Sequence, residues 1–148
     1  MIKHYVIDGN NLIGKMSQSG KRNTSSREQL VLKLDRYFHQ KKVNVSLHFD
    51  GFEKETISAT KIRIFYSQKR TADALIKNEI ENHNSSKSIC VVTSDFNLME
   101  FARVCSCKVK KSEEFANELK DNIDRDNEEE KIKSISNEEM RKLFLDNS

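Results

Sequence analysis

The chain has 148 residues, a length typical of one domain built around one hydrophobic core. Hydrophobic residues make up 36% of it, which is too many for a wholly disordered protein, and no apolar run approaches the ~18 residues of a membrane-spanning helix. The net charge of +3 is unevenly distributed, because residues 1–111 hold 20 Lys and Arg against 11 Asp and Glu, while residues 112–148 hold 6 against 12. A basic body suits an anionic partner such as nucleic acid, although a lysine-rich soluble surface has the same composition.

The cysteines and the first residues bear on the compartment. Cys90, Cys105 and Cys107 form neither a disulfide framework nor a CxxC zinc site. The first residues lead directly into a strand-like segment instead of a signal peptide. We therefore expect a cytoplasmic protein with no membrane partner.

Short apolar runs alternate with segments of helical periodicity along the body of the chain. Strands are predicted over residues 5–7, 43–49, 62–66, 89–92 and 107–109. A capping box from Ser25 to Glu28 opens a helix that extends to Phe38, and further helices are predicted over 72–83, over 96–104 and from 112 onward. Repeated strand–helix alternation predicts an α/β fold with a parallel sheet and helices on both faces.

The end of the chain differs from the body in composition. Residues 121–134 are rich in Asp, Glu and Asn, which indicates a solvated linker or the exposed end of the preceding helix. Residues 135–148 contain a second capping box, from Ser136 to Glu139, and an apolar stripe behind it. We therefore predict a domain over 1–120, an acidic linker over 121–134, and a short amphipathic helix over 135–148 that docks on the body or on a partner.

Four aspartates are predicted to meet at one edge of this sheet. Asp8, Asp50 and Asp95 follow the first, second and fourth strands, and Asp73 lies in the first turn of the helix after the third. The carboxyl ends of parallel strands lie at the same edge, so these side chains converge there. Converging carboxylates repel each other, and a divalent cation removes that cost. Oxygen ligands favour Mg²⁺ or Mn²⁺, which can activate water against a phosphodiester.

Each aspartate also has a purely structural interpretation. Asp8-Gly9 and Asp50-Gly51 are common turn dipeptides, Asp73 suits the dipole of its helix, and Asp95 can be an N-cap. One metal site would explain all four positions, whereas the structural interpretation needs four separate coincidences at one edge. A further interpretation is a small-molecule phosphohydrolase on another α/β fold. Such an enzyme would need a second acid two residues after Asp8, and the chain has Asn10 at that position.

Four motifs resemble those of one nuclease family. Residues 8–14 (DGNNLIG) resemble the opening motif of NYN domains, which are PIN-like nucleases, and the likeness is strongest to the bacterial YacP-type branch. Residues 49–51 (FDG), 71–76 (TADALI) and 92–95 (VTSD) are similar to that branch's later motifs, in the same order. The resemblance implies a PIN-like three-layer α/β/α fold whose central, mainly parallel sheet has about five strands.

The resemblance also implies a function: an endoribonuclease that needs Mg²⁺ or Mn²⁺ and hydrolyses single-stranded RNA, in some members mRNA on the ribosome. By position, the metal-binding core would comprise Asp8, Asp73 and Asp95. Asn11 would hold a metal-bound water or the phosphate, and Ser94 would orient a ligand by a hydrogen bond or make a helix-capping contact. Asp50 would be a further metal ligand, at a position where not all PIN-like relatives have an acid.

Basic residues near these motifs are candidates for RNA binding. Lys69 and Arg70 precede Asp73 and can bind a phosphate beside the cut. Lys15, Lys21 and Arg22 are predicted in a loop after the first strand, which can close over a single strand. Solvated surface charge is the alternative for all five. The competing function is an RNA- or ribosome-binding module that keeps the fold and cleaves little.

Overall fold

The structure is a computed structural model that describes residues 1–17 and 27–146, with side chains described up to residue 129. The capping box at Ser25 and the basic residues Lys21 and Arg22 lie outside the described residues.

Five parallel strands form one sheet in the order β3-β2-β1-β4-β5. Their bounds are β1 (His4–Asp8), β2 (Asn44–Phe49), β3 (Ile62–Tyr66), β4 (Ile89–Val92) and β5 (Lys108–Lys110). The chain moves outward from β1 to β3 on one side and returns to β4 on the other, so the strand order reverses beside β1. All five carboxyl ends lie at one edge. The predicted α/β fold and its five-stranded sheet are confirmed.

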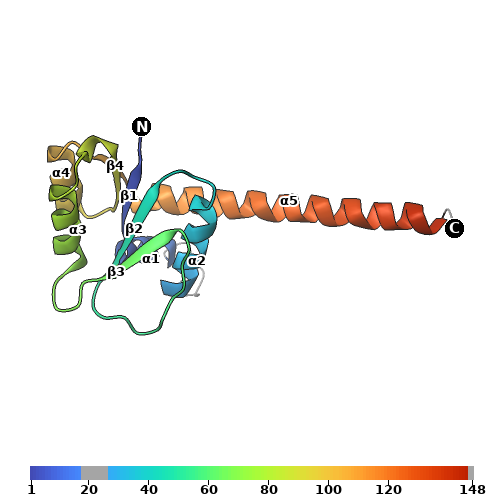
Figure 1. The fold of residues 1–148 in the computed structure, drawn as a ribbon, viewed down its shortest axis with the longest axis horizontal. Coiled ribbons are helices and arrows are strands. Elements are labelled where there is room, and N and C mark those ends of the chain that lie inside the picture. Colours follow the sequence, from blue (N-terminus) through green and yellow to red (C-terminus); the bar gives the residue numbers. More distant parts are fainter. Residues whose placement is uncertain (18–26, 147–148) are drawn as a thin grey trace.

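Helices cover both faces of the sheet (Figure 1). One face carries α1 (Gly9–Ser17), α2 (Arg27–Phe38) and the first turns of α5 (Ser112–Asp146). The other face carries α3 (Ala72–Glu81) and α4 (Phe96–Val104), and a short 3-10 helix, η1 (Ser86–Ser88), precedes β4. The molecule is therefore the predicted three-layer α/β/α arrangement.

Residues of the central strands alternate between the two cores. Ile7 and Val92 pack with α1, α2 and α5, whereas Val6 and Val91 pack with α3 and α4. All four side chains are fully buried. The period of two along a strand places successive side chains on opposite faces, so β1 and β4 contribute to both cores.

Helix α1 was not predicted from the sequence. Its nine residues contain two glycines and two asparagines, which favour loops, yet Leu12 is fully buried. Gly9 is the first residue of α1, and a Cβ there would lie 2.6 Å from a ring atom of Phe49 and 2.7 Å from the His48 carbonyl oxygen. Asp8-Gly9 is therefore not a turn: the glycine allows α1 to start directly against β2. Lys15 lies on α1 and not in a loop.

Helix α5 is continuous over the segment predicted as a linker and a second helix. The chain contains no proline, and no glycine follows Gly51, so nothing in the linker breaks a helix. Ser136 lies inside α5 and does not begin a helix. Residues 121–134 are thus the end of the preceding helix, the alternative left open above. The predicted separation of a domain at about residue 120 stays a prediction.

The two ends of α5 differ in their surroundings. Phe115 and Leu119 are buried and pack in the core beneath α1 and α2. Beyond them, the ribbon of α5 leads away from the body (Figure 1). The backbone of α5 therefore does not return to the body, and docking of the end of the chain on the body or on a partner stays a prediction. No helix among the described residues combines the length and the apolar content needed to cross a membrane.

Candidate functional site

Asp8 ends the central strand at the point where the strand order reverses. Burial raises the pKa of its carboxyl from 3.8 to about 6, against the lowering effect of hydrogen bonds from Thr93 and the Asn11 backbone. The negative charges of Asp50 and Asp95 raise that pKa further. Asp50 and Asp95 therefore lie near enough to Asp8 to repel it, and a cation among the three would relieve the repulsion.

Thr93 connects two of these acids. Its hydroxyl donates to Asp8 Oδ2 at 3.0 Å and accepts a hydrogen bond from the Asp95 backbone N–H at 3.1 Å. Thr93 is fully buried, so both contacts are shielded from water. No role was predicted for Thr93 from the sequence. Its position between β4 and Asp95, within the motif at 92–95, was the available signal.

Asn11 is fixed by two donors from distant parts of the chain. Its Oδ1 accepts from the Ser94 backbone N–H at 2.9 Å and from the Ser112 hydroxyl at 2.6 Å. A backbone N–H can only donate, so the atom facing Ser94 is the oxygen, and both its lone pairs are used. The side-chain NH₂ is the group that can act on a substrate. This geometry favours the phosphate-holding role of Asn11 over a role in accepting from a metal-bound water.

Ser94 joins the start of α4 to the start of α5. Its hydroxyl accepts from the Ser112 backbone N–H at 2.9 Å and donates to Glu113 Oε2 at 2.7 Å. Glu113 Oε1 forms an ion pair with Lys15 Nζ at 3.2 Å, and the contacts with Ser94 and Lys15 lower the pKa of the Glu113 carboxyl. Lys15, expected to bind RNA, thus has an acidic partner. Glu113 is an acid at this edge that the sequence analysis missed, although it follows the fifth strand as the aspartates follow the others.

Asp50 links β2 to two helices. Its Oδ1 accepts from the Ala72 backbone N–H, at the start of α3, at 2.7 Å. Its own backbone N–H donates to Asn10 Oδ1 at 2.9 Å. The following residue, Gly51, has a φ of +85°, so the turn interpretation holds for this dipeptide.

Asp73 and Asp95 each have a structural contact as well. Asp73 forms an ion pair with Lys77, one turn later in α3, at 3.1 Å. Asp95 is the N-cap of α4, since its Oδ1 accepts from the Leu98 backbone N–H at 3.1 Å. Each contact uses one carboxylate oxygen. The second oxygen of Asp95 has no hydrogen bond with any described residue.

The described acids do not form a closed metal cage. Within the described part of the chain, no three His, Cys, Asp or Glu side chains lie close enough together to hold one metal ion. Mg²⁺ commonly keeps several waters and binds proteins through only one or two carboxylates. Asp8, with Asp50 and Asp95 near it, fits a hydrated ion of this kind better than a dehydrated one.

Comparisons with known proteins identify the family. Two crystal structures of Rae1 (YacP) from Bacillus subtilis are similar to the whole fold. A tryptophan-to-leucine mutant gives a TM-score of 0.71 at 24% identity, covering 90% of this chain and 85% of that one. The other structure gives 0.70 at 24% identity, covering 99% and 89%. The model of the YacP-like NYN domain matches residues 5–148. The chain belongs to the YacP-like NYN domain family. No curated protein matches it.

The family match covers almost the whole chain. The match extends to residue 148, so the family includes the acidic end of the chain as well as the body. This NYN domain has the nuclease-like fold of its family, and at its carboxyl edge Asp8 ends a strand while Asp50 and Asp95 each follow one.

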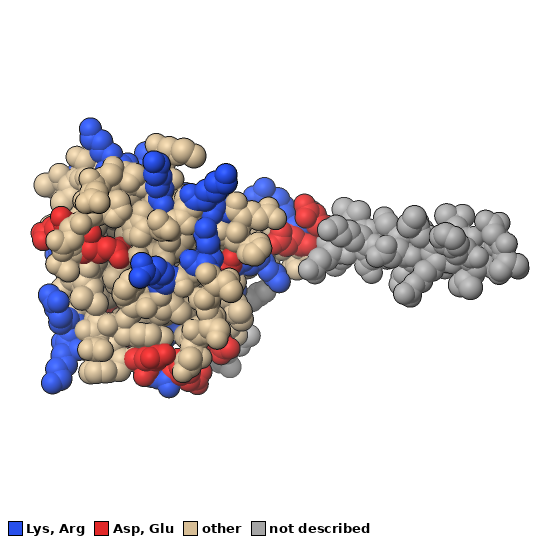
Figure 2. All heavy atoms as spheres, viewed as in Figure 1, with Lys and Arg blue, Asp and Glu red and all other residues tan. Residues whose placement is uncertain are grey.

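Basic side chains of this NYN domain lie near the same edge. Lys69 and Arg70 are exposed in the loop between β3 and α3. That loop adjoins Gly51, because the Gln68 backbone N–H donates to the Gly51 carbonyl at 2.7 Å. On the face shown in Figure 2, Lys and Arg side chains are spread over the body with smaller groups of acids between them. This arrangement favours contact with an extended anion.

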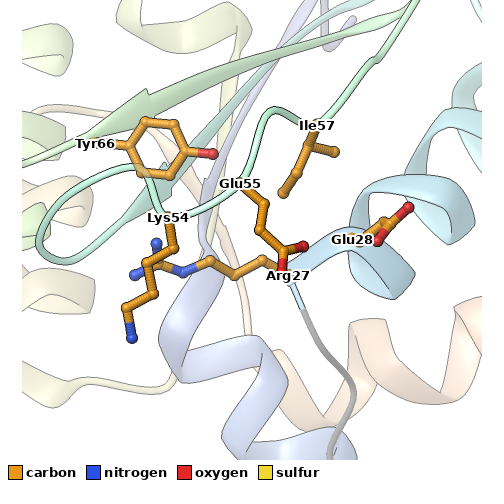
Figure 3. Close-up of a pocket in the computed structure, with 6 residues that line it drawn as sticks. All are labelled: Arg27, Glu28, Lys54, Glu55, Ile57 and Tyr66. Carbon is orange, nitrogen blue, oxygen red and sulfur yellow. The ribbon is translucent and has the colours of Figure 1, made fainter.

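A hollow of about 250 Å³ lies beside this edge, between the start of α2 and the loop after β2 (Figure 3). Its lining consists of Arg27, Glu28, Lys54, Glu55, Ile57 and Tyr66. None of the candidate acids lines it. The hollow is thus separate from the carboxylates, and it adjoins them through Arg27, which donates to the Asp50 carbonyl at 2.6 Å.

Proposed function

We propose that this chain is an endoribonuclease that uses Mg²⁺ or Mn²⁺ to hydrolyse single-stranded RNA. The proposal rests on the place of the half-buried Asp8 carboxyl at the carboxyl edge of the sheet, where desolvation and the nearby Asp50 and Asp95 raise its pKa to about 6. A perturbed carboxyl among like charges is a feature of functional sites, and the family is nuclease-like.

Each residue of the site has a role in this proposal. Asp8 would hold the metal ion, with Asp50, Asp73 and Asp95 as the further ligands, directly or through its waters. The bound ion supplies activation of water and neutralises charge on the scissile phosphate. Thr93 fixes the Asp8 carboxylate by its hydrogen bond at 3.0 Å.

The remaining groups act on the RNA backbone. The Asn11 side-chain NH₂ donates to a phosphate oxygen, because its carbonyl is already held by Ser94 and Ser112. Lys69 and Arg70 bind a phosphate beside the cut. Lys15, Lys21 and Arg22 stay proposed contacts, with Lys15 exchanging its Glu113 partner for RNA.

The biological substrate we propose is mRNA in the cytoplasm, including mRNA on the ribosome. Support for this part comes from the resemblance to the YacP-type branch. Comparing cleavage of the same mRNA free and during translation tests it, and equal cleavage in both states would contradict a role for the ribosome.

An assay of RNA cleavage tests the activity. Purified protein is incubated with end-labelled single-stranded RNA in Mg²⁺, in Mn²⁺ or in EDTA, beside Asp8→Asn and the control Glu81→Gln, which changes an exposed acid of α3. We expect internal cleavage by the wild type and by the control in either metal, none in EDTA, and none by Asp8→Asn. Cleavage in EDTA or by Asp8→Asn would contradict the proposal.

The alternative function is an RNA- or ribosome-binding module with little cleavage. It is favoured by the structural contacts of Asp50, Asp73 and Asp95 and by the lack of a three-ligand group among the described residues. The same assay separates the two functions, because a binding module would retain labelled RNA and leave it intact in both metals.

A further inference from the structure

Two aromatic side chains are exposed on either side of the candidate acids. Phe52 follows Asp50 by two residues and is 55% exposed, and Phe96 directly follows Asp95 and is 68% exposed. Strands β2 and β4, which lead to these residues, are the two neighbours of β1. The backbone of each phenylalanine therefore lies at the carboxyl edge, with Asp8 between them.

The segment that carries Phe52 is held in place although its ring is exposed. Arg27 donates to the Phe52 carbonyl at 2.9 Å and to the Asp50 carbonyl at 2.6 Å. The Arg27 guanidinium lies 5.0 Å from the ring centre of Phe49 and 5.5 Å from that of Tyr66, and Figure 3 shows Arg27 with Tyr66 at this place. An aromatic ring on a backbone fixed in this way loses little conformational entropy when it binds a ligand.

Basic residues lie in a loop next to the segment that carries Phe52. The Gln68 backbone N–H donates to the Gly51 carbonyl at 2.7 Å, which places the loop with exposed Lys69 and Arg70 beside Phe52. Separate aromatic rings with cations around them are typical of surfaces that bind single-stranded nucleic acid. A protein partner is better served by one contiguous apolar patch.

We propose that Phe52 and Phe96 are stacking platforms for the two unpaired bases that flank the scissile phosphate of an RNA. This rests on the proposed function, which places that phosphate at Asp8. Every base has a π face, so the two rings select for unpaired RNA and tolerate different sequences. Bases inside a duplex are already stacked and cannot reach the rings.

Binding without cleavage tests the proposal. The probe is a fluorescein-labelled single-stranded RNA of about 16 nucleotides, its affinity measured by anisotropy in EDTA. We expect Phe52→Ala and Phe96→Ala each to weaken binding by about 5- to 30-fold, and Phe52→Trp and Phe96→Trp to retain it. Leu32→Ala, on α2, is the matched control, because Leu32 is 60% exposed and should bind RNA as the wild type does. A duplex of the same sequence should respond to none of these changes.

Salt dependence separates stacking from charge. The phenylalanine variants should lower the affinity for RNA by the same factor at every salt concentration. Lys69→Ala should instead reduce the slope of log K against log salt concentration by about 1. Both rings are exposed, so unchanged melting temperatures confirm that the variants are folded. The proposal would be overturned if Phe52→Ala and Phe96→Ala bound single-stranded RNA as tightly as the wild type does. It would also be overturned if those variants bound RNA normally and lost binding to a protein partner.

The binding assay and the cleavage assay test the stacking role and the proposed function separately. If the wild type binds RNA through both rings and does not cleave it in Mg²⁺ or Mn²⁺, the proposed function is wrong and the stacking role stands. If the wild type cleaves and the phenylalanine variants bind normally, the function stands and the stacking role is wrong.

Discussion

Asp8 carries an electrostatic cost in the folded chain. Its carboxyl is half-buried, and desolvation together with the nearby Asp50 and Asp95 raises its pKa from 3.8 to about 6. Between these pH values the folded protein keeps a proton that the unfolded chain releases. The free energy of unfolding therefore falls as the pH rises through this window, and the loss is complete above about pH 6.

Asp8→Asn is expected to stabilise the metal-free protein at pH 7 by about 1–3 kcal/mol. Asparagine removes the buried charge, and its carbonyl oxygen can still accept from Thr93. Urea unfolding in EDTA at a series of pH values measures this, and the fall in stability between about pH 3.8 and 6 should be smaller in the variant. Unfolding of Asp8→Asn at lower urea than the wild type at pH 7 would show that Asp8 is a structural residue.

The sequence predicted which strand ends carry acids and missed the contacts between the residues of the candidate site. Asp8, Asp50 and Asp95 were placed at one edge, because each follows a recognisable strand and parallel strands share that edge. Thr93 contacts Asp8, 85 residues away in the sequence, and Glu113 contacts Ser94, 19 residues away. A local sequence pattern does not reveal contacts between residues so far apart. For the same reason, the two donors that occupy the Asn11 carbonyl were not foreseeable.

At the scale of elements, α1 links the fold to the site. The sheet and most helices followed from periodicity, but α1 is short, rich in residues with low helix propensity, and stabilised by burial of Leu12. It begins directly after Asp8, and it places Asn11 within its first turn. A single glycine allows this close approach to β2.

Gly9→Ala and Gly14→Ala are expected to have opposite effects. The new methyl of Gly9→Ala would meet the Phe49 ring and the His48 carbonyl, which should cost about 1–3 kcal/mol of stability. Nothing lies within 4 Å of a Cβ at Gly14, inside the same helix, so Gly14→Ala should gain about 0.5–1 kcal/mol. Denaturant midpoints of the two variants measure the difference. Equal stability of both variants would contradict the close packing of α1 on β2.

At the scale of the whole molecule, α5 joins the core and then leaves it. Among its described residues, Ser112, Phe115 and Leu119 are buried. The sequence indicated a boundary near residue 120 from composition alone. Composition distinguishes a solvated segment from a packed one, but it cannot separate a flexible linker from a solvated helix, since the same polar residues suit both.

Truncation of the chain after Glu129 is expected to change stability by less than about 0.5 kcal/mol, because Ser112, Phe115 and Leu119, the buried residues in the described part of α5, remain. Phe115→Ala in the full chain should cost about 3–5 kcal/mol, and Phe115→Leu less than about 1.5 kcal/mol. Urea midpoints measure all three. A large loss on truncation would mean that the end of α5 packs on the body after all.

The proposed function requires that the carboxyl edge around Asp8 holds a divalent cation. Thermal unfolding with and without Mn²⁺ tests it most directly, because an ion at 100 times its Kd adds about 2.7 kcal/mol. For a chain of this length we predict a rise of about 5–10 °C for the wild type and for Glu81→Gln, and none for Asp8→Asn. An equal rise for Asp8→Asn and the wild type would place the ion elsewhere and contradict the account.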